Sequence, residues 1–256
     1  MIRSPDGTDT KHRIWGGSMK QIISSLLLVL VWALAHPALA QLEDKPVPMD
    51  KAPFHIPAFS NDYIILMKIN IPPGRTTGFH THYADSVSVN LSSASRTNQV
   101  YGESEVSGPA IAGEMAPGRL SFTDIRNESP RTHKVTNVGP TPFYNVSFIL
   151  RDPRSGGPAV SDRSGAAGYT QIMDNPRLRA WRVVMEPGEA TGQIEQTAPG
   201  LRVYVRGGVL DEMIPGSASR GMAPYDGEFI WQDAGQTRAV KNSGATLIEF
   251  IEFEFK

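Results

Sequence analysis

Hydrophobic and polar residues alternate along short segments of this chain. In segment 142–150 they alternate around Asn145 and Ser147, and in 251–255 Ile and Phe alternate with glutamate. A period of two is typical of a strand, so we predict strands with one buried face at both places. Other candidates are rich in β-branched or aromatic residues and bounded by turn-forming residues. The expected strands are 63–71, 86–91, 119–123, 133–137 and 142–150, then 178–185, 201–206, 228–232, 237–241 and 246–255.

The composition agrees with an all-β fold. The chain has 256 residues, of which 24 are Gly and 20 are Pro, so turns are frequent. After residue 45 we find no long apolar stretch at helical spacing. The length is compatible with one large domain or two small ones.

An internal repeat favours two domains. Segment 71–78 (Ile-Pro-Pro-Gly-x-x-x-Gly) corresponds to 185–192 (Met-Glu-Pro-Gly-x-x-x-Gly), at an offset of 114 residues. Segment 133–139 (His-x-x-x-Asn-x-Gly) corresponds to 238–244 (Arg-x-x-x-Asn-x-Gly), at an offset of 105. Two matches of this kind indicate two similar domains. We expect the first domain at 58–152, a linker at 153–175 and the second domain at 176–256.

The N-terminus predicts export. Residues 19–40 contain Lys20, an apolar run at 22–34 and the cleavage pattern Ala38-Leu39-Ala40, which is the layout of a secretory signal peptide. The run is shorter than the roughly 18 apolar residues of a membrane span, so we expect no stable membrane anchor after signal removal. We interpret residues 1–18 as a non-native upstream extension and 41–57 as a Pro-rich extended lead-in. The mature protein would be periplasmic or secreted.

Charge and cysteine content exclude several classes of protein. With 25 Lys+Arg against 26 Asp+Glu, the formal net charge is −1, which gives no electrostatic case for nucleic acid. The chain has no cysteine, which rules out disulfides, thiol catalysis and thiolate metal ligands.

Histidines provide the candidate chemistry. His80 and His82 have the i, i+2 spacing that puts both imidazoles on one face of a strand, where they can bind one metal ion. Asp85 follows three residues later, and His133 lies downstream. We expect His55, in the lead-in, to be structural. None of these residues alone would be a strong signal.

Together the motifs resemble those of the cupin superfamily, in its two-domain form, the bicupin. Five residues separate Gly74 from His80-Thr81-His82, as in the first cupin motif. The second motif runs from Gly118 to His133 and Asn137, although its central Pro-x-Gly is not intact. The resemblance implies an all-β fold of two tandem cupin-type (jelly-roll) antiparallel β-barrels.

The resemblance also implies one divalent metal ion, of Fe, Mn, Ni, Cu or Zn, with His80, His82, Asp85 and His133 as its ligands. The family usually has Glu where this chain has Asp85, and three histidines alone would still bind a metal. Tyr83 and Arg131 flank the motifs and could contact a substrate.

The second domain lacks these ligands. The corresponding positions hold Ile194, Gln196, Pro199 and Arg238. Because such side chains do not form this kind of site, we expect the domain to be structural, packing on the first or mediating association into a homo-oligomer. An alternative is an anion pocket formed by Arg238 with Arg202 or Arg206.

Function beyond metal binding stays open between two classes. The first is a metal-dependent enzyme acting on a small-molecule substrate as a dioxygenase, a decarboxylase, or a sugar-acid isomerase or lyase. The second is a non-catalytic periplasmic protein that binds a metal or a small molecule. An isomerase or lyase would require a general acid or base near the metal, whereas a dioxygenase requires open coordination positions on a redox-active metal.

Overall fold

A computed structural model describes residues 45–109, 116–151 and 159–256. These residues form antiparallel β-barrels and one short 3-10 helix, η1 (Met49–Lys51). Within these ranges, no helix has the length and apolar character needed to cross a membrane. The predicted signal peptide (19–40) and upstream extension (1–18) lie outside the described residues.

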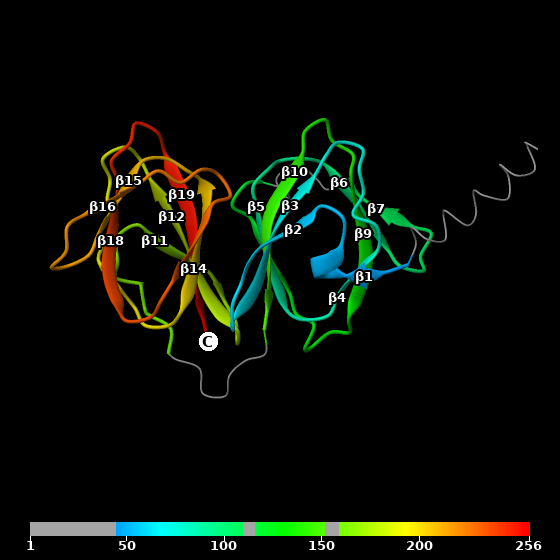
Figure 1. Cartoon of the computed structure of the whole chain (residues 1–256), viewed down its shortest axis with the longest axis horizontal. Coiled ribbons are helices and arrows are strands. Elements are labelled where there is room, and N and C mark those ends of the chain that lie inside the picture. Colours follow the sequence, from blue (N-terminus) through cyan, green and yellow to red (C-terminus); the bar gives the residue numbers. More distant parts are fainter. Residues whose placement is uncertain (1–44, 110–115, 152–158) are drawn as a thin grey trace, which may run out of the picture. The chain divides into compact units, whose positions relative to one another are not determined.

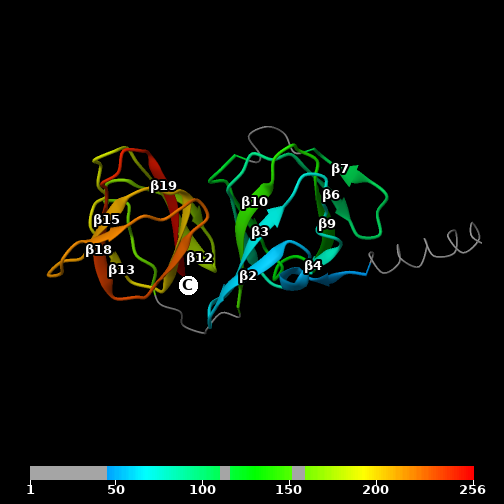
Figure 2. The same ribbon diagram turned by 45° about the horizontal axis from the view of Figure 1, so that its top comes forward.

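The first barrel consists of two five-stranded sheets, with strand orders β1-β4-β9-β6-β7 and β2-β3-β10-β5-β8. Figure 1 shows the barrel, and Figure 2 shows β2, β3 and β10 side by side. Its strands are β1 (Val47–Pro48), β2 (His55–Ser60), β3 (Ile64–Ile71), β4 (His80–His82), β5 (Ser86–Asn90), β6 (Arg96–Val100), β7 (Val106–Ser107), β8 (Leu120–Thr123), β9 (Arg131–Asn137) and β10 (Phe143–Leu150).

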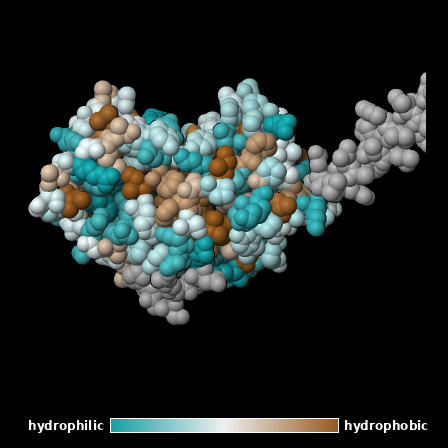
Figure 3. Space-filling model, viewed as in Figure 1, coloured by the Kyte–Doolittle hydropathy of each residue, from teal (hydrophilic) through white to brown (hydrophobic). Residues whose placement is uncertain are grey.

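The second barrel has sheets with strand orders β11-β12-β19-β14-β17 and β13-β18-β15-β16. Its strands are β11 (Tyr169–Asp174), β12 (Leu178–Met185), β13 (Ile194–Gln196), β14 (Gly200–Arg206), β15 (Leu210–Met213), β16 (Arg220–Met222), β17 (Phe229–Gln232), β18 (Gln236–Asn242) and β19 (Ile248–Phe255). On the face of the molecule in Figure 3, hydrophobic residues lie in small groups among hydrophilic ones.

The two barrels repeat the same strand pairing. In the first, His80 of β4 lies opposite His133 of β9, and in the second Ile194 of β13 lies opposite Arg238 of β18. The side-chain amide of Asn137 donates to the carbonyls of Ile71 and Thr141. The amide of Asn242 donates in the same way to Met185 and Thr246. The repeat in the sequence is therefore a repeat in structure, and its two asparagines hold equivalent turns.

The largest apolar cluster joins the two barrels. It combines β3, β5 and β10 of the first barrel with β12, β14 and β19 of the second. Phe148 and Phe253 meet edge-on within it, with ring centroids 5.1 Å apart. Burying large apolar side chains on this scale is the main favourable term in folding, and removing one such phenylalanine typically costs about 3–5 kcal/mol.

Strands β10 and β19 correct one prediction. Both were expected to expose their polar face, but both are buried on their two sides over most of their length. The apolar residues of β19, such as Phe253, point to the shared cluster, while Glu252 and Glu254 are fully buried on the opposite side. The alternation identified two faces correctly, but the polar face lines a barrel interior instead of meeting solvent.

Two of the expected boundaries also differ from the structure. The predicted lead-in, 41–57, contains β1 and the start of β2, which pair with β4 and β3. The predicted linker, 153–175, contains β11. It also contributes Arg163, which is 1% exposed and lies over the ring of Trp181 at 4.0 Å. The local sequence of these segments indicated loops, because the strands with which they pair lie far away along the chain.

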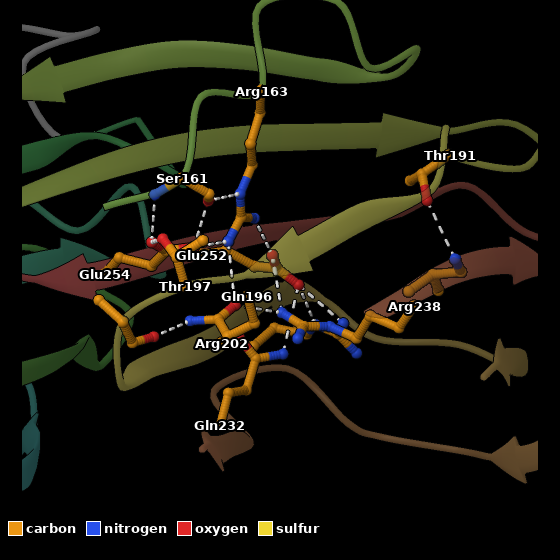
Figure 4. A network of polar contacts seen from close by, with 12 residues as sticks. Ser161, Arg163, Thr191, Gln196, Thr197, Arg202, Gln232, Arg238, Glu252 and Glu254 are labelled. Atoms are coloured by element: carbon orange, nitrogen blue, oxygen red, sulfur yellow. Dashed lines mark hydrogen bonds and ion pairs between the residues drawn. The ribbon is translucent and has the colours of Figure 1, made fainter. Parts of the chain in front are cut away.

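Glu252 is the centre of a charge cluster in the second barrel (Figure 4). Its carboxylate accepts bonds from Arg202 at 2.7 Å and Arg238 at 3.2 Å, and it also pairs with Arg163. Burial opposes ionisation of Glu252, but the three arginines outweigh it and hold the pKa of the carboxyl well below its usual range. Arg163 also pairs with Glu254 at 2.6 Å, and Arg202 with Glu212 at 3.3 Å. Three arginines thus face three glutamates.

We predict that Glu252→Gln lowers the free energy of unfolding by about 3 to 5 kcal/mol, because it leaves buried arginines without their counter-charge. Chemical denaturation measures the change. The matched control is Glu195→Gln on β13 of the same barrel, where the side chain is exposed, and it should shift stability by less than about 0.5 kcal/mol. Equal effects of the two substitutions would contradict the role given to Glu252.

Candidate metal centre

Strands β4 and β9 bring the three predicted histidines together. A turn containing Gly74 and Gly78, both with positive φ (72° and 64°), leads the chain into β4. In β4 His80 and His82 are buried on the same face, and His133 stands opposite His80 on β9. The candidate ligand atoms of the three residues lie within 4.8 Å of one another. Among the described residues this is the one such group of potential metal ligands.

The distances within the group fit a shared cation. The Nε2 atoms of His82 and His133 are 3.0 Å apart. Two ligands at about 2.1 Å from one ion and at right angles to each other would be separated by about 3 Å, so this spacing suits neighbouring ligands. The ring centroids of His80 and His133 are 4.6 Å apart, and those of His80 and His82 are 5.4 Å apart.

Each histidine is oriented through its other ring nitrogen. Nδ1 of His80 lies 3.3 Å from the carbonyl of Gly78, and Nδ1 of His82 lies 3.3 Å from Oγ of Ser86. Nδ1 of His133 is hydrogen-bonded to Oδ1 of Asn98. When Nδ1 carries the proton and donates it to these oxygens, the lone pair of every Nε2 is free for a metal. This donor set fits a divalent ion.

Burial keeps the three imidazoles neutral. It is the largest cause that lowers the pKa of His80 to about 3, His82 to about 4 and His133 to about 2. Neighbouring histidines add to the effect at His80, as do other histidines and Arg131 at His133. Since a metal competes with protons for the same lone pairs, neutral histidines at neutral pH favour metal binding.

The group opens into a cavity of about 760 Å³ in the first barrel. Its volume is within the range of small-molecule sites. The wall includes apolar side chains, such as Ile69 and Phe143, as well as polar ones, such as Asn98 and Asn145. The geometry therefore combines a potential metal centre with room for an organic ligand.

The comparisons with known proteins agree with this geometry. No protein-family model matches the chain, and no curated protein matches it in sequence. Solved structures do match it. A variant of salicylate 1,2-dioxygenase from Pseudoaminobacter salicylatoxidans, in complex with gentisate, has a TM-score of 0.54 at 12% identity, covering 87% of this chain and 79% of that one. Another salicylate 1,2-dioxygenase structure from the same organism has a TM-score of 0.52 at 11% identity, covering 85% and 81%.

A cupin domain from Bordetella pertussis matches 41% of this chain and 99% of its own, at 22% identity and a TM-score of 0.33. Two tandem barrels with a three-histidine group in the first are now established. The chain has the bicupin fold. The predicted all-β class and the two cupin-type barrels are confirmed.

Asp85 does not join the three histidines. Its carboxylate pairs with Arg177 of the second barrel and with Arg126, whose Nε lies 3.3 Å away. It also accepts a bond from the backbone N–H of Arg126 at 3.1 Å. Asp85 is 1% exposed, so these partners replace its water shell. Asp85 therefore forms a buried ion pair between the two barrels. The prediction that Asp85 is a metal ligand is corrected, because its carboxylate does not lie with the histidines.

His55 and Asn98 are site residues that the sequence did not reveal. His55 lines the cavity, and its ring centroid lies 4.9 Å from that of His80. It comes from β2, and Asn98 from β6, neither of which was a predicted strand. Of the two flanking residues, Arg131 lines the cavity, whereas the hydroxyl of Tyr83 donates to Asp50 at 3.2 Å.

In the second barrel, two of the residues that correspond to the histidines, Gln196 and Arg238, belong to the charge cluster around Glu252. Gln196 accepts from Arg238 at 2.8 Å, Ile194 is buried, and Pro199 offers only its backbone carbonyl, which accepts from Phe255 at 3.0 Å. Since Arg238 and Arg202 are paired with Glu252, and Arg206 is exposed at the end of β14, the anion pocket considered for these arginines is not formed.

We predict that Asp85→Asn lowers the free energy of unfolding by about 3 kcal/mol while leaving the metal content unchanged. The loss follows from the uncompensated charge of buried Arg177. Asp174→Asn is the matched control, because Asp174 also has two cationic partners, Arg179 and Lys256, but is one-third exposed, so about 1 kcal/mol or less is expected. Denaturation and elemental analysis give the two readouts. Loss of metal in Asp85→Asn would contradict this prediction and support the hypothesis that Asp85 is a metal ligand.

Proposed function

We propose that this bicupin is a metal-dependent enzyme that acts on a small organic molecule in its first barrel, by dioxygenase chemistry. The observation that carries the proposal is the convergence of His80, His82 and His133 on one point at the wall of a ligand-sized cavity. Three ligands leave further coordination positions for a substrate. A divalent, redox-active metal bound there would supply Lewis acidity and oxygen chemistry.

The lining of the cavity favours this reaction over isomerase or lyase chemistry. Among the described residues that line it, none is Asp, Glu, Tyr or Lys, and His55 is the one imidazole besides the three candidate ligands. Asp85, the carboxylate that follows the histidines in the sequence, is held by Arg177 and is not free to act as a general base at the site. The fold similarity to salicylate 1,2-dioxygenase supports the same choice.

The residues around the site have separate tasks. Asn98, Ser86 and the carbonyl of Gly78 hold the three imidazoles in place through Nδ1. Apolar residues on the wall, such as Ile69 and Phe143, exclude water and strengthen the electrostatic interactions inside the cavity. A substrate would be held between these walls and the histidines.

Elemental analysis tests the proposal. Protein expressed from Gln41 onward and purified without chelator should contain about one redox-active metal per chain, and His80→Ala/His82→Ala should reduce this to background. His55→Asn is the control, because His55 lies outside the candidate ligand set and the variant should keep its metal. Metal-dependent oxygen uptake with a panel of small organic substrates then tests the reaction.

Two outcomes would contradict the proposal. Stoichiometric zinc without oxygen uptake would favour hydrolytic, lyase or structural roles. Absence of metal after reconstitution would leave a non-catalytic binding protein with a cupin fold.

We also infer that the mature chain is exported to the periplasm or secreted. The charged start, the apolar run and the Ala38-Leu39-Ala40 pattern of residues 19–40 support this inference. When the full chain is expressed in a bacterial host, N-terminal sequencing of the periplasmic fraction should begin at Gln41. Recovery of the protein in the cytosol with residues 19–40 still attached would contradict export.

A further inference from the structure

Three arginines line the cavity of the first barrel: Arg96 of β6, Arg119 immediately before β8, and Arg131 at the start of β9. They come from three separate strand regions, which the fold brings to the wall of one cavity. The cavity wall is therefore much richer in positive charge than the chain as a whole, which has a formal net charge of −1.

Arg131 lies beside the histidine group. It stands directly opposite His82 in the pairing of β4 with β9, and it shares the inward face of β9 with His133 and Val135.

Arg96 approaches from the next strand. It lies opposite Asn137 in the pairing of β6 with β9, and its guanidinium carbon is 5.7 Å from the centroid of the Phe143 ring. Arg119 is exposed at the cavity wall and adjoins Leu120 and Ser121, which line the cavity as well.

The described part of the cavity wall holds arginines but no acidic residue. No Asp or Glu occurs among the described residues that line the cavity, and across the described ranges neither Arg119 nor Arg131 has an ion-pair partner. The second barrel is the opposite case, because its three buried arginines face three glutamates. Positive charge in a cavity with low-dielectric walls attracts anions.

We propose that the cavity of the first barrel binds a small organic anion, whose carboxylate or phosphate group is attracted by Arg119 and Arg131 on the cavity wall, with Arg96 adding positive charge. The apolar part of the ligand packs on Ile71, Phe122 and the other hydrophobic residues of the wall. This inference rests on the proposed function and deepens it, because it names the substrate class of the same cavity.

The chemistry of arginine fits this role. A guanidinium group presents paired N–H donors that match two oxygens of a carboxylate or a phosphate. A cavity of about 760 Å³ accepts a ligand considerably larger than the anionic group alone, so an apolar portion has room beside the arginines.

Binding measurements with matched probes test the proposal. Isothermal titration calorimetry is carried out with 2-naphthoate, 2-naphthyl phosphate and the neutral 2-naphthamide, on protein as purified and after removal of metal by chelation. At least one anion should bind about tenfold or more tightly than the amide, and the ratio of carboxylate to phosphate affinity identifies the preferred group. High salt should weaken the binding of the anion and leave the affinity for the amide unchanged.

Arg131→Gln and Arg119→Gln should each lower the affinity for the preferred anion by about tenfold, with little effect on the affinity for the amide. Both arginines are exposed, so folding is not at risk. Arg75→Gln is the matched control, because Arg75 is an exposed arginine of the same barrel that does not line the cavity. It changes the net charge equally and should leave the affinity unchanged.

The inference would be overturned if the anion and the amide bound with equal affinity, or if Arg131→Gln left the anion affinity unchanged. It would also be overturned if no saturable anion binding occurred at millimolar concentrations.

These outcomes can be distinguished from a failure of the proposed metal-dependent function. Anion binding that survives chelation and is lost in Arg131→Gln supports this inference even in a protein without metal. Stoichiometric metal without a preference for anions removes this inference alone.

Discussion

The apolar cluster between the two barrels determines how both interiors are built. Strands β10 and β19 direct Phe148 and Phe253 into this cluster. Because side chains alternate along a strand, the residues between them must point into the barrels. In β19 these include Glu252 and Glu254, and in β10 they include Asn145 and Ser147. Packing the barrels together through apolar faces thus leaves polar groups inside, where each needs a partner.

The two barrels satisfy this requirement differently. In the second, arginines on β14 and β18 and in the segment before β11 neutralise the glutamates, and the interior is filled by ion pairs (Figure 4). In the first, the corresponding region holds neutral histidines and amides around an open cavity. The equivalent position of the strand pairing holds His133 in the first barrel and Arg238 in the second, so the difference between the two interiors is visible at one residue. A buried charge network thus occupies the second barrel in the place where the first barrel has its cavity.

The sequence predicted what depends on local spacing. The i, i+2 histidines and the two repeated motifs were recognisable because each is specified within a few neighbouring residues. His55 and Asn98 were missed, since they reach the site on strands whose pairing is set by distant partners. The burial of Glu252 was missed because alternation separates two faces without saying which one meets solvent. The role of Asp85 depends on Arg177, which is 92 residues away along the chain.

The position of Asp85 also bears on the charge of the ligand site. A carboxylate ligand would cancel part of the charge of a divalent ion, whereas three neutral imidazoles leave that charge intact. Because Asp85 is held in a bond with Arg177, its carboxylate is not among the residues that line the cavity. The same residue that joins the barrels therefore leaves the region around His80, His82 and Arg131 without a protein anion among the described residues. A negatively charged substrate would complete the electrostatic balance that the second barrel achieves with glutamates.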